Sequence, residues 1–222
     1  MRNANLILSS SMRFLGFILF MFSAQVLLAA KPDGSTINPL SSFSSEWNDA
    51  RYAACNTAAK VRYLSASEKN VIFILNMART NPKLFRETVL SKIKTYDDFV
   101  DTTSEVYYRS LVALMETMKP LPLLYPDSLC FVSSKAHAVT SGKTGYVGHD
   151  RQNAASRKAT HFMGECCSYG TGDPLGIVTQ LIVDENVPSL GHRKICFGSY
   201  SVMAVSIQPH KLYGSMSVLD FY

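Results

Sequence analysis

The chain lacks the short motifs that mark many familiar catalytic sites. Its 222 residues contain no His-Glu-x-x-His zinc motif, no Gly-x-Ser-x-Gly nucleophile elbow and no phosphate-cradling glycine loop. No Cys-x-x-Cys pair indicates a zinc knuckle or a redox motif. Any chemistry must therefore come from residues that are distant in sequence and are brought together by folding.

The chain also lacks runs of Lys or Arg. Its formal net charge is +5, and without residues 1–30 it holds 20 basic against 17 acidic residues, a net of +3. Nucleic-acid binding therefore has no electrostatic support. The apolar fraction of 47% and the charged fraction of 18% are typical of a globular protein with a core. The length suits one domain with additional targeting or linker segments.

Residues 1–30 are predicted to be a secretory signal peptide. Arg2 and Arg13 precede an uncharged apolar stretch, residues 14–30, which ends in Ala29 and Ala30. An uncleaved anchor is the alternative, because these 17 residues approach membrane-spanning length. Either way the remaining chain leaves the cytoplasm. We expect a secreted, periplasmic or extracellular protein, with no membrane span in the mature chain if the signal is cleaved.

Export changes the interpretation of the five cysteines, since disulfides persist in oxidising compartments. An odd number leaves at least one thiol unpaired or paired between chains. Their spacing does not define the pairing. They are Cys55, Cys130, Cys166, Cys167 and Cys196.

Residues 31–63 are predicted to be a linker or N-terminal arm, because their first part is rich in Ser, Pro and Gly. Ser65 and Glu68 have capping-box spacing, so a helix is expected to start there and to end at Asn81-Pro82. Asp127 is predicted to cap a helix that stops at Gly142. Further helices are expected at 82–93, 104–118 and 174–186. The apolar face of the helix at 104–118 is expected to consist of Val106, Leu111, Leu114 and Met115.

Near the end of the chain, apolar residues alternate with polar ones. The alternation covers 201–208 and 213–222, with turn residues between them, and predicts a hairpin or two neighbouring strands. Helices followed by a late antiparallel sheet indicate the α+β class.

The candidate site residues stand at the edges of apolar elements. They are His149, Glu165, Asp184 or Glu185, and His192. Two imidazoles and two carboxylates can bind zinc or a similar divalent ion. The same groups can act as acid and base, with the carboxylates orienting the imidazoles. The simpler alternative for each histidine is a solvated surface residue.

Six segments follow one another in an order that resembles a known family. They are "NMARTNPKLFRETVL", "KPLPLLYPDSLC", "GKTGYVGHD", "GECCSYG", "VDENVPSLGHRK" and "VSIQPHKLYGSMSVLDF". Together they are similar to bacterial extracellular members of the CAP superfamily: cysteine-rich secretory proteins, antigen 5 and pathogenesis-related 1 proteins, also called the SCP domain. The resemblance covers residues 64–222, nearly all of the mature chain.

The resemblance implies an α-β-α sandwich with a central antiparallel sheet. It also implies a cleft with two histidines and two acids that binds a divalent metal, often zinc. His149 and His192 match the family histidines, and Glu165 matches the acid of its Gly-Glu-Asn motif. Asp184 matches the second acid best, with Glu185 one residue away; helix geometry alone favours neither.

The chain departs from the family pattern in two places. Cys166 stands where Gly-Glu-Asn has its Asn, and Leu190 stands where bacterial relatives tend to have Arg. A disulfide from Cys166 or Cys167 to Cys196 would hold Glu165 in place of that Asn.

The other singled-out residues receive simpler interpretations. His137 is expected in or near the core, and His161 and His210 in loops. Arg193 is expected either to pair with a carboxylate of the cleft or to lie on the surface. Tyr146 and Tyr169 flank the candidate residues, as cleft walls or as packing.

The leading interpretation is a secreted CAP-domain protein whose cleft binds a lipid, a small molecule or a protein partner, through a divalent metal. No general enzymatic activity follows from the resemblance. The enzyme alternative is a metal-assisted hydrolase or peptidase with Glu165 as base. A third interpretation is a structural or adhesive surface protein.

Overall fold

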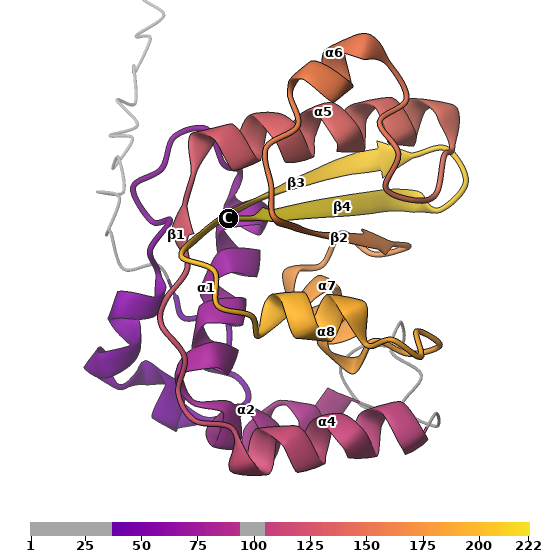
Figure 1. Ribbon diagram of the computed structural model, residues 1–222. Helices are drawn as coiled ribbons and strands as arrows, with labels where there is room; N and C mark the ends of the chain where they lie inside the picture. The colour runs from indigo at the N-terminus through magenta and orange to yellow at the C-terminus, as the bar shows by residue number, and fades with distance from the viewer. Residues whose placement is uncertain (1–36, 94–104) are drawn as a thin grey trace, which may run out of the picture. The chain divides into compact units, whose positions relative to one another are not determined.

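The computed structural model describes residues 37–93 and 105–222 (Figure 1). The predicted signal segment, residues 1–30, lies outside the described residues. The described elements are η1 (Ser45–Asn48), η2 (Ala50–Cys55), α1 (Ala66–Thr80), α2 (Pro82–Thr88), η3 (Leu90–Lys92), α4 (Glu105–Thr117), β1 (Tyr125–Pro126), α5 (Ser128–Thr144), α6 (Ala154–Lys158), β2 (Gly164–Tyr169), α7 (Pro174–Val183), α8 (Gly191–Cys196), β3 (Val202–His210) and β4 (Gly214–Phe221). This mixture of helices and one sheet confirms the α+β class.

The four strands have the order β1-β3-β4-β2. The predicted hairpin is present, since β3 and β4 pair antiparallel from Met203 opposite Phe221 to His210 opposite Gly214. β2 pairs antiparallel with β4, but the two-residue β1 pairs parallel with β3. The sheet is therefore mixed, not purely antiparallel as expected. Pro126, which has no N–H to donate, fits the edge position of β1.

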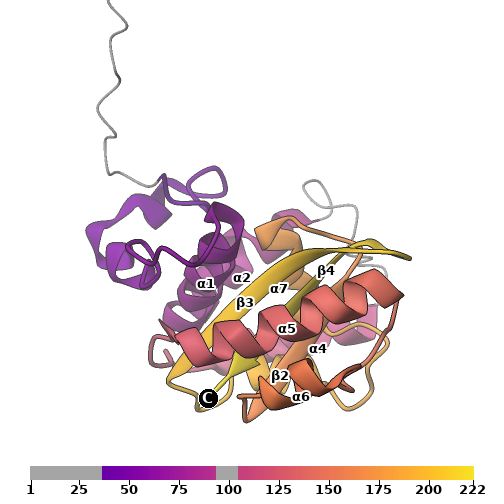
Figure 2. The same cartoon turned by 90° about the horizontal axis from the view of Figure 1, so that it is seen from above.

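Helices lie on both faces of the sheet. α5 packs across β3 and β4 on one face, while α1, α7 and α8 contact the sheet from the other (Figures 1 and 2). β2 lies at the sheet edge, between the helix pair α5 and α6 and the helix pair α7 and α8. Residues on β2 can therefore meet loops from both helical layers.

The predicted caps form, although one helix ends later than expected. Ser65 and Glu68 make both hydrogen bonds of a capping box, and the Asp127 side chain accepts from the Cys130 N–H at the start of α5. α5 continues past Gly142 to a left-handed Gly145. At Gly142 an added Cβ would lie 2.1 Å from the Pro209 carbonyl oxygen. Gly142 is therefore a point of close approach to β3 and not a helix stop.

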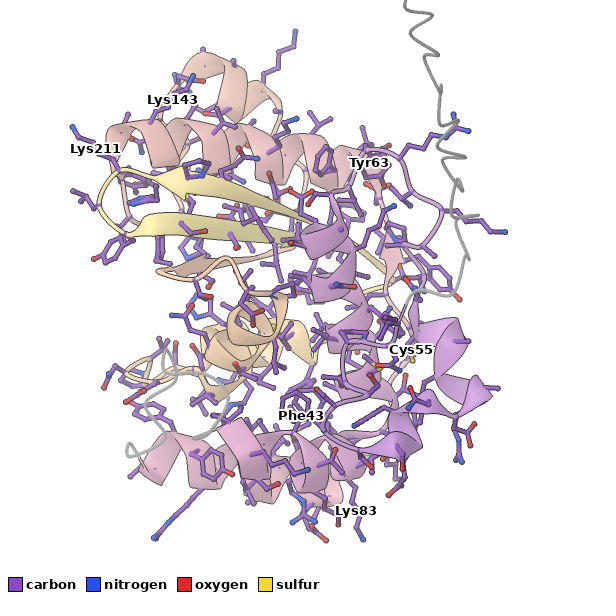
Figure 3. All side chains as sticks on the ribbon, turned by 180° about the vertical axis from the view of Figure 1, so that it is seen from behind. Phe43, Cys55, Tyr63, Lys83, Lys143 and Lys211 are labelled. Carbon is purple, nitrogen blue, oxygen red and sulfur yellow. The ribbon has the colours of Figure 1, made fainter. Side chains whose placement is uncertain are left out.

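The arm expected at 31–63 packs against the core from residue 37 onward. It forms η1 and η2, and it buries the side chains of Leu40, Phe43, Trp47 and Tyr52. Figure 3 labels Phe43 and Cys55, two buried residues of this segment. The Trp47 Nε1–H donates to the Thr88 hydroxyl in α2 at 2.9 Å. Its aromatic residues therefore make this segment part of the fold, despite its polar composition.

The structure also differs from three smaller predictions. In α4, Leu111 and Met115 are buried, but Val106 and Leu114 are exposed. The helix at 174–186 ends at Val183, and His210 is a buried residue of β3 and not a loop residue.

No helix among the described residues has the length and apolar character needed to cross a membrane.

Candidate functional site

A cleft of about 300 Å³ lies beside β2, and we call it the β2 cleft. It is bounded by β2, by the C-terminal half of α7 and the segment after it, and by the start of α8. Its lining combines apolar and polar side chains: Cys167, Tyr169, Gln180, Leu181, Val183, Asp184, Glu185, Asn186, Val187 and His192.

On the α5 side of β2, Glu165 is held by two cationic or hydrogen-donating partners. The His149 Nδ1 lies 2.8 Å from its Oε1, and the Arg151 Nη2 donates to its Oε2 at 2.5 Å. A second nitrogen of Arg151 donates to the His149 carbonyl at 3.2 Å. The Glu165 side chain is buried, whereas that of His149 is 54% exposed. Glu165 therefore anchors an exposed imidazole to the sheet.

These partners shift the pKa values of the pair in opposite directions. Burial opposes ionisation of Glu165, but the hydrogen bonds from His149 and Arg151 outweigh it and hold the pKa of Glu165 at about 2. The hydrogen bond to Glu165 raises the pKa of His149 despite partial burial of the ring. At neutral pH Glu165 is thus an anion with both oxygens engaged.

The loop before His149 is fixed by its neighbouring glycine. The Gly148 N–H donates to the Tyr169 hydroxyl at 3.1 Å, and its carbonyl lies 2.9 Å from the His137 Nε2. Gly148 has φ 133, and an added Cβ there would lie 2.7 Å from the Tyr146 hydroxyl. A side chain at this position would displace the loop that presents His149.

The second acid and histidine come from the other helical layer. Asp184 ends α7 in a left-handed conformation, with φ 57, which Asp tolerates better than most residues. Its Oδ1 lies 2.7 Å from the His192 Nδ1, and its Oδ2 accepts from the Arg193 N–H at 3.1 Å. The Asp184 carboxylate is therefore directed onto the start of α8.

Arg193 fits neither of the two roles expected for its side chain. It is buried, and its guanidinium donates to the carbonyls of Ile182, Val183 and Tyr107 and to the Ser110 hydroxyl. The side chain thus ties α4 and α7 to α8. Only its backbone N–H bonds a carboxylate of the cleft.

The two histidines approach each other from opposite layers. Their ring centroids lie 6.4 Å apart, at an interplanar angle of 36°. Each ring uses Nδ1 for its carboxylate, and neither Nε2 has a hydrogen bond among residues 37–93 and 105–222. A carboxylate at Nδ1 fixes the tautomer in which Nε2 is the lone-pair nitrogen, the arrangement found behind many metal-ligating histidines.

The fold brings the four preferred candidates together as two pairs, His149 with Glu165 and Asp184 with His192. Asp184 and His192 line the β2 cleft, and the other pair lies beside it, since the two histidine rings are 6.4 Å apart. The structure also shows which of the two neighbouring acids, Asp184 or Glu185, pairs with His192. Glu185 lines the β2 cleft, but the His192 ring is bonded to Asp184.

Sequence reasoning missed three groups around Glu165. Arg151 follows His149 by two residues, and a basic residue so close to a candidate histidine was the available signal. His137 is buried as expected, but its Nε2 also lies 4.0 Å from the Glu165 Oε1. The Cys167 Sγ lies 3.8 Å from the His149 Nδ1, on the same face of β2 as Glu165. His137, Glu165 and Cys167 also form a buried group with donor atoms within 4.8 Å of one another.

All five cysteines carry free thiols in the structure, and all are buried. The Cys166 and Cys196 side chains are neighbours that interact electrostatically, and the Cys166 Sγ lies 3.7 Å from the His192 carbonyl oxygen. Burial, and then Cys196, raises the pKa of Cys166. Cys167 points to the opposite face of β2 from Cys166, as strand alternation requires.

No protein-family model, curated protein or solved structure matches the chain. The interpretation of the site therefore depends on the geometry of the chain itself.

Proposed function

We propose that the protein is an exported member of the CAP superfamily and that the β2 cleft binds a small ligand through a divalent metal ion. The proposal joins the ordered segments that resemble this family to the arrangement of helices on both faces of a central sheet. The same arrangement supports the α-β-α sandwich as the finer description of the fold.

One observation carries this proposal. Two imidazoles from opposite layers, with ring centroids 6.4 Å apart, are each oriented through Nδ1 by a buried carboxylate. Orienting an exposed ring in this way restricts its freedom, which costs conformational entropy. Such an arrangement is useful when the remaining Nε2 atoms have a common task, and metal ligation is the task that suits two neutral imidazole nitrogens.

The residues present fit a zinc-type ion held by His149 and His192, with Glu165 and Asp184 as their orienting partners. When bound, such an ion would polarise or anchor an oxygen or nitrogen donor of the ligand. The lining fits a ligand of limited size with an apolar part, since Leu181, Val183 and Val187 border the cleft beside polar groups. A volume of about 300 Å³ lies at the low end for small-molecule sites.

The geometry around Glu165 favours binding over hydrolysis. A general base works best when its pKa lies near the working pH. Both Glu165 oxygens already accept hydrogen bonds, and its pKa of about 2 makes it a weak base. Its supported role is to position His149.

The test replaces each histidine by asparagine and measures zinc binding by titration calorimetry. Asparagine keeps an N–H donor near the Nδ1 position, so the carboxylate remains paired, but it has no counterpart of Nε2. We expect His149→Asn and His192→Asn each to abolish one zinc-binding event that the wild-type protein shows, with little change in the melting temperature of the metal-free protein.

Ligand binding is tested in parallel by mass spectrometry of small molecules that co-purify with the native protein. The ligand should be lost on chelation and in both asparagine variants. If both variants bind zinc at the cleft as the wild-type protein does, the metal part of the proposal is wrong. If ligand retention is also unchanged, the two histidines have no part in ligand binding.

A further inference from the structure

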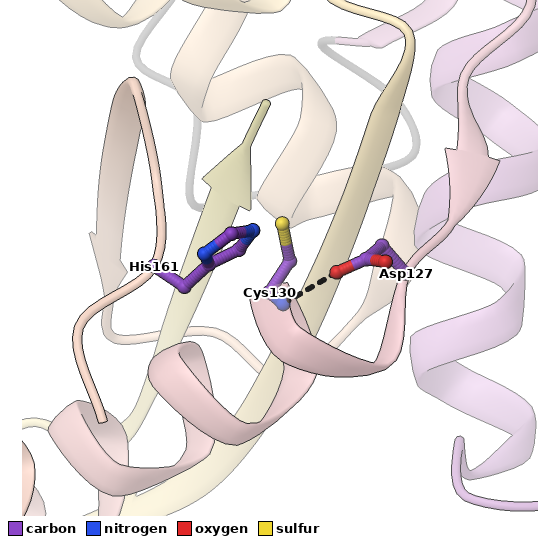
Figure 4. A group of neighbouring side chains, drawn as sticks. All are labelled: Asp127, Cys130 and His161. Atoms are coloured by element: carbon purple, nitrogen blue, oxygen red, sulfur yellow. Dashed lines mark hydrogen bonds between the residues drawn. The ribbon is translucent and has the colours of Figure 1, made fainter.

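A second group of potential metal ligands lies away from the β2 cleft, at the start of α5. Asp127 caps this helix, Cys130 lies in its first turn, and His161 lies in the segment between α6 and β2 (Figure 4). The carboxylate oxygen, the sulfur and a ring nitrogen of these residues all lie within 4.8 Å of one another. Figure 4 shows the sulfur between the carboxylate and the imidazole.

Local structure holds each of the three side chains in place. The Asp127 Oδ1 accepts from the Cys130 N–H at 2.8 Å, so the carboxylate is directed at the first turn of α5. The His161 N–H donates to the Ser133 hydroxyl of α5 at 3.0 Å, and its ring stacks on Tyr222 with centroids 4.5 Å apart. The Cys130 side chain is buried, and its sulfur lies within 4.8 Å of the donor atoms of both other residues. The three donors are thus arranged before any ion binds.

Each residue alone has an ordinary structural explanation: a helix cap, a core thiol and a stacked ring. Those explanations do not require the three donor atoms to converge. Thiolate, imidazole and carboxylate together form a ligand set that zinc takes in proteins, with distances of about 2.0–2.3 Å to each donor atom. A modest contraction of the observed spacing meets that requirement.

The charges and the access also suit a cation. Asp127 and His161 are partly exposed, so an ion can reach the group from solvent, while the buried sulfur supplies the soft ligand. The Asp127 and Asp220 carboxyl groups both interact electrostatically with the Cys130 thiol. Neither group is a cation that would repel the ion.

We propose that Asp127, Cys130 and His161 form a zinc-type metal site with a solvent molecule in the fourth position. On binding, the Cys130 thiol gives its proton to solvent and the sulfur coordinates the ion as a thiolate. The site is independent of the β2 cleft, since it shares none of the four residues proposed there.

Cobalt(II) added to the reduced, metal-free chain tests this site, because a cobalt–thiolate bond produces a near-ultraviolet charge-transfer band that nitrogen and oxygen ligands do not. We expect the wild-type protein to show this band at saturation. Cys130→Ser should lose it, and Cys55→Ser, at another buried free thiol, should keep it. Cys167→Ser and the double variant His149→Asn/His192→Asn should also keep it, which separates the site from the cleft.

Asp127→Asn is the matched variant for the carboxylate, because asparagine caps helices as well as aspartate does but offers no anionic ligand. We expect its cobalt affinity to fall roughly 10-fold or more, while the melting temperature of the metal-free protein stays the same. The proposal is overturned if the wild-type protein shows no thiolate band, if the band persists in Cys130→Ser, or if Asp127→Asn binds cobalt like the wild-type protein. The Asp127→Asn outcome decides even if Cys130→Ser does not fold.

Discussion

Glu165 and Asp220 lie directly opposite each other across the β2–β4 pair, with Arg151 reaching both carboxyl groups. The Arg151 Nη2 lies 2.5 Å from the Glu165 Oε2 and 3.8 Å from the Asp220 Oδ2. Like charges at such cross-strand positions repel. Neither oxygen of Asp220 has a hydrogen-bond partner among the described residues. Burial, and then the charge of Glu165, raises the pKa of Asp220 to about 8. One carboxyl is thus an anion at neutral pH while its neighbour is largely protonated.

Asp220 should make the protein less stable as the pH rises. Its pKa is about 8 in the folded state against an ordinary value of 3.8 for an Asp carboxyl, so between these values the folded state binds more protons than the unfolded state. The free energy of unfolding therefore loses a contribution as the pH rises from about 4 to 8. In Asp220→Asn this loss should disappear, and the difference between the two proteins should grow by on the order of 1 kcal/mol per pH unit within the window. Urea denaturation at several pH values measures it.

Glu46→Gln, at an exposed acid, is the matched control for Asp220→Asn and should run parallel to the wild-type protein. Parallel curves for Asp220→Asn and the wild-type protein between pH 4 and 8 would show that Asp220 is ionised in the folded state.

Glu165→Gln should lower the pKa of Asp220. The substitution removes the neighbouring negative charge but leaves Arg151 beside Asp220, so ionisation of Asp220 becomes less costly. Titration of the Asp220 carboxyl carbon by NMR measures the shift directly. Asp150→Asn, at an exposed acid of the same loop, should leave the Asp220 titration close to that of the wild-type protein; an unchanged titration in Glu165→Gln would contradict the coupling.

The stability that Glu165 contributes should be lost in acid. Its pKa of about 2 lies below the ordinary value of 4.5 for a Glu carboxyl, so its contribution is complete above about pH 4.5 and is lost as the pH falls toward 2. Acid unfolding of the wild-type protein should therefore steepen in this window, and Glu165→Gln should lack the corresponding slope. Circular dichroism during an acid titration follows both proteins. A slope that is equally steep in Glu165→Gln would assign the acid transition to other carboxyls.

Cys166 and Cys196 are expected to form a disulfide in an oxidising compartment. Their side chains are neighbours, and a bond would join β2, next to Glu165, to the end of α8, which carries His192. Oxidation by a disulfide donor would remove both thiol protons and reduce the donor to two thiols. Protein from an oxidising compartment should show two fewer titratable thiols under denaturing conditions than the same protein after reduction. Cys196→Ser should abolish the difference, whereas Cys55→Ser should not; the reverse pattern would assign the bond elsewhere.

Local signals in the sequence predicted the helix starts well. Ser65 with Glu68, Pro82 and Asp127 act on hydrogen bonds within one turn, so neighbouring residues suffice to locate them. The stop at Gly142 was wrong because the glycine serves contact with Pro209, 67 residues later. That requirement exists only in the folded chain.

The residues of the candidate site were likewise only partly predictable from the sequence. His149, Glu165, Asp184 and His192 were chosen as candidates because they stand at the edges of apolar elements, and the family resemblance then favoured Asp184 over Glu185. Arg151 was missed although it follows His149 by only two residues. Asp220 was missed because its role arises from strand register, which places it opposite Glu165. β2 was missed as a strand because all but its last residue are buried, so it has no alternation of polar and apolar residues.

Trp47 should be as important to stability as a residue of the main helices. Its side chain is fully buried, its ring centroid lies 4.7 Å from that of Tyr52 and 6.4 Å from that of Phe85, and it bonds Thr88. Trp47→Ala should lower the free energy of unfolding by about 3–5 kcal/mol, because it leaves a cavity between the N-terminal segment and α2. Ile37→Ala, at a side chain that is 82% exposed in the same segment, should change it by less than about 0.5 kcal/mol. Equal effects in chemical denaturation would mean that residues 37–63 are the dispensable arm that their composition suggests.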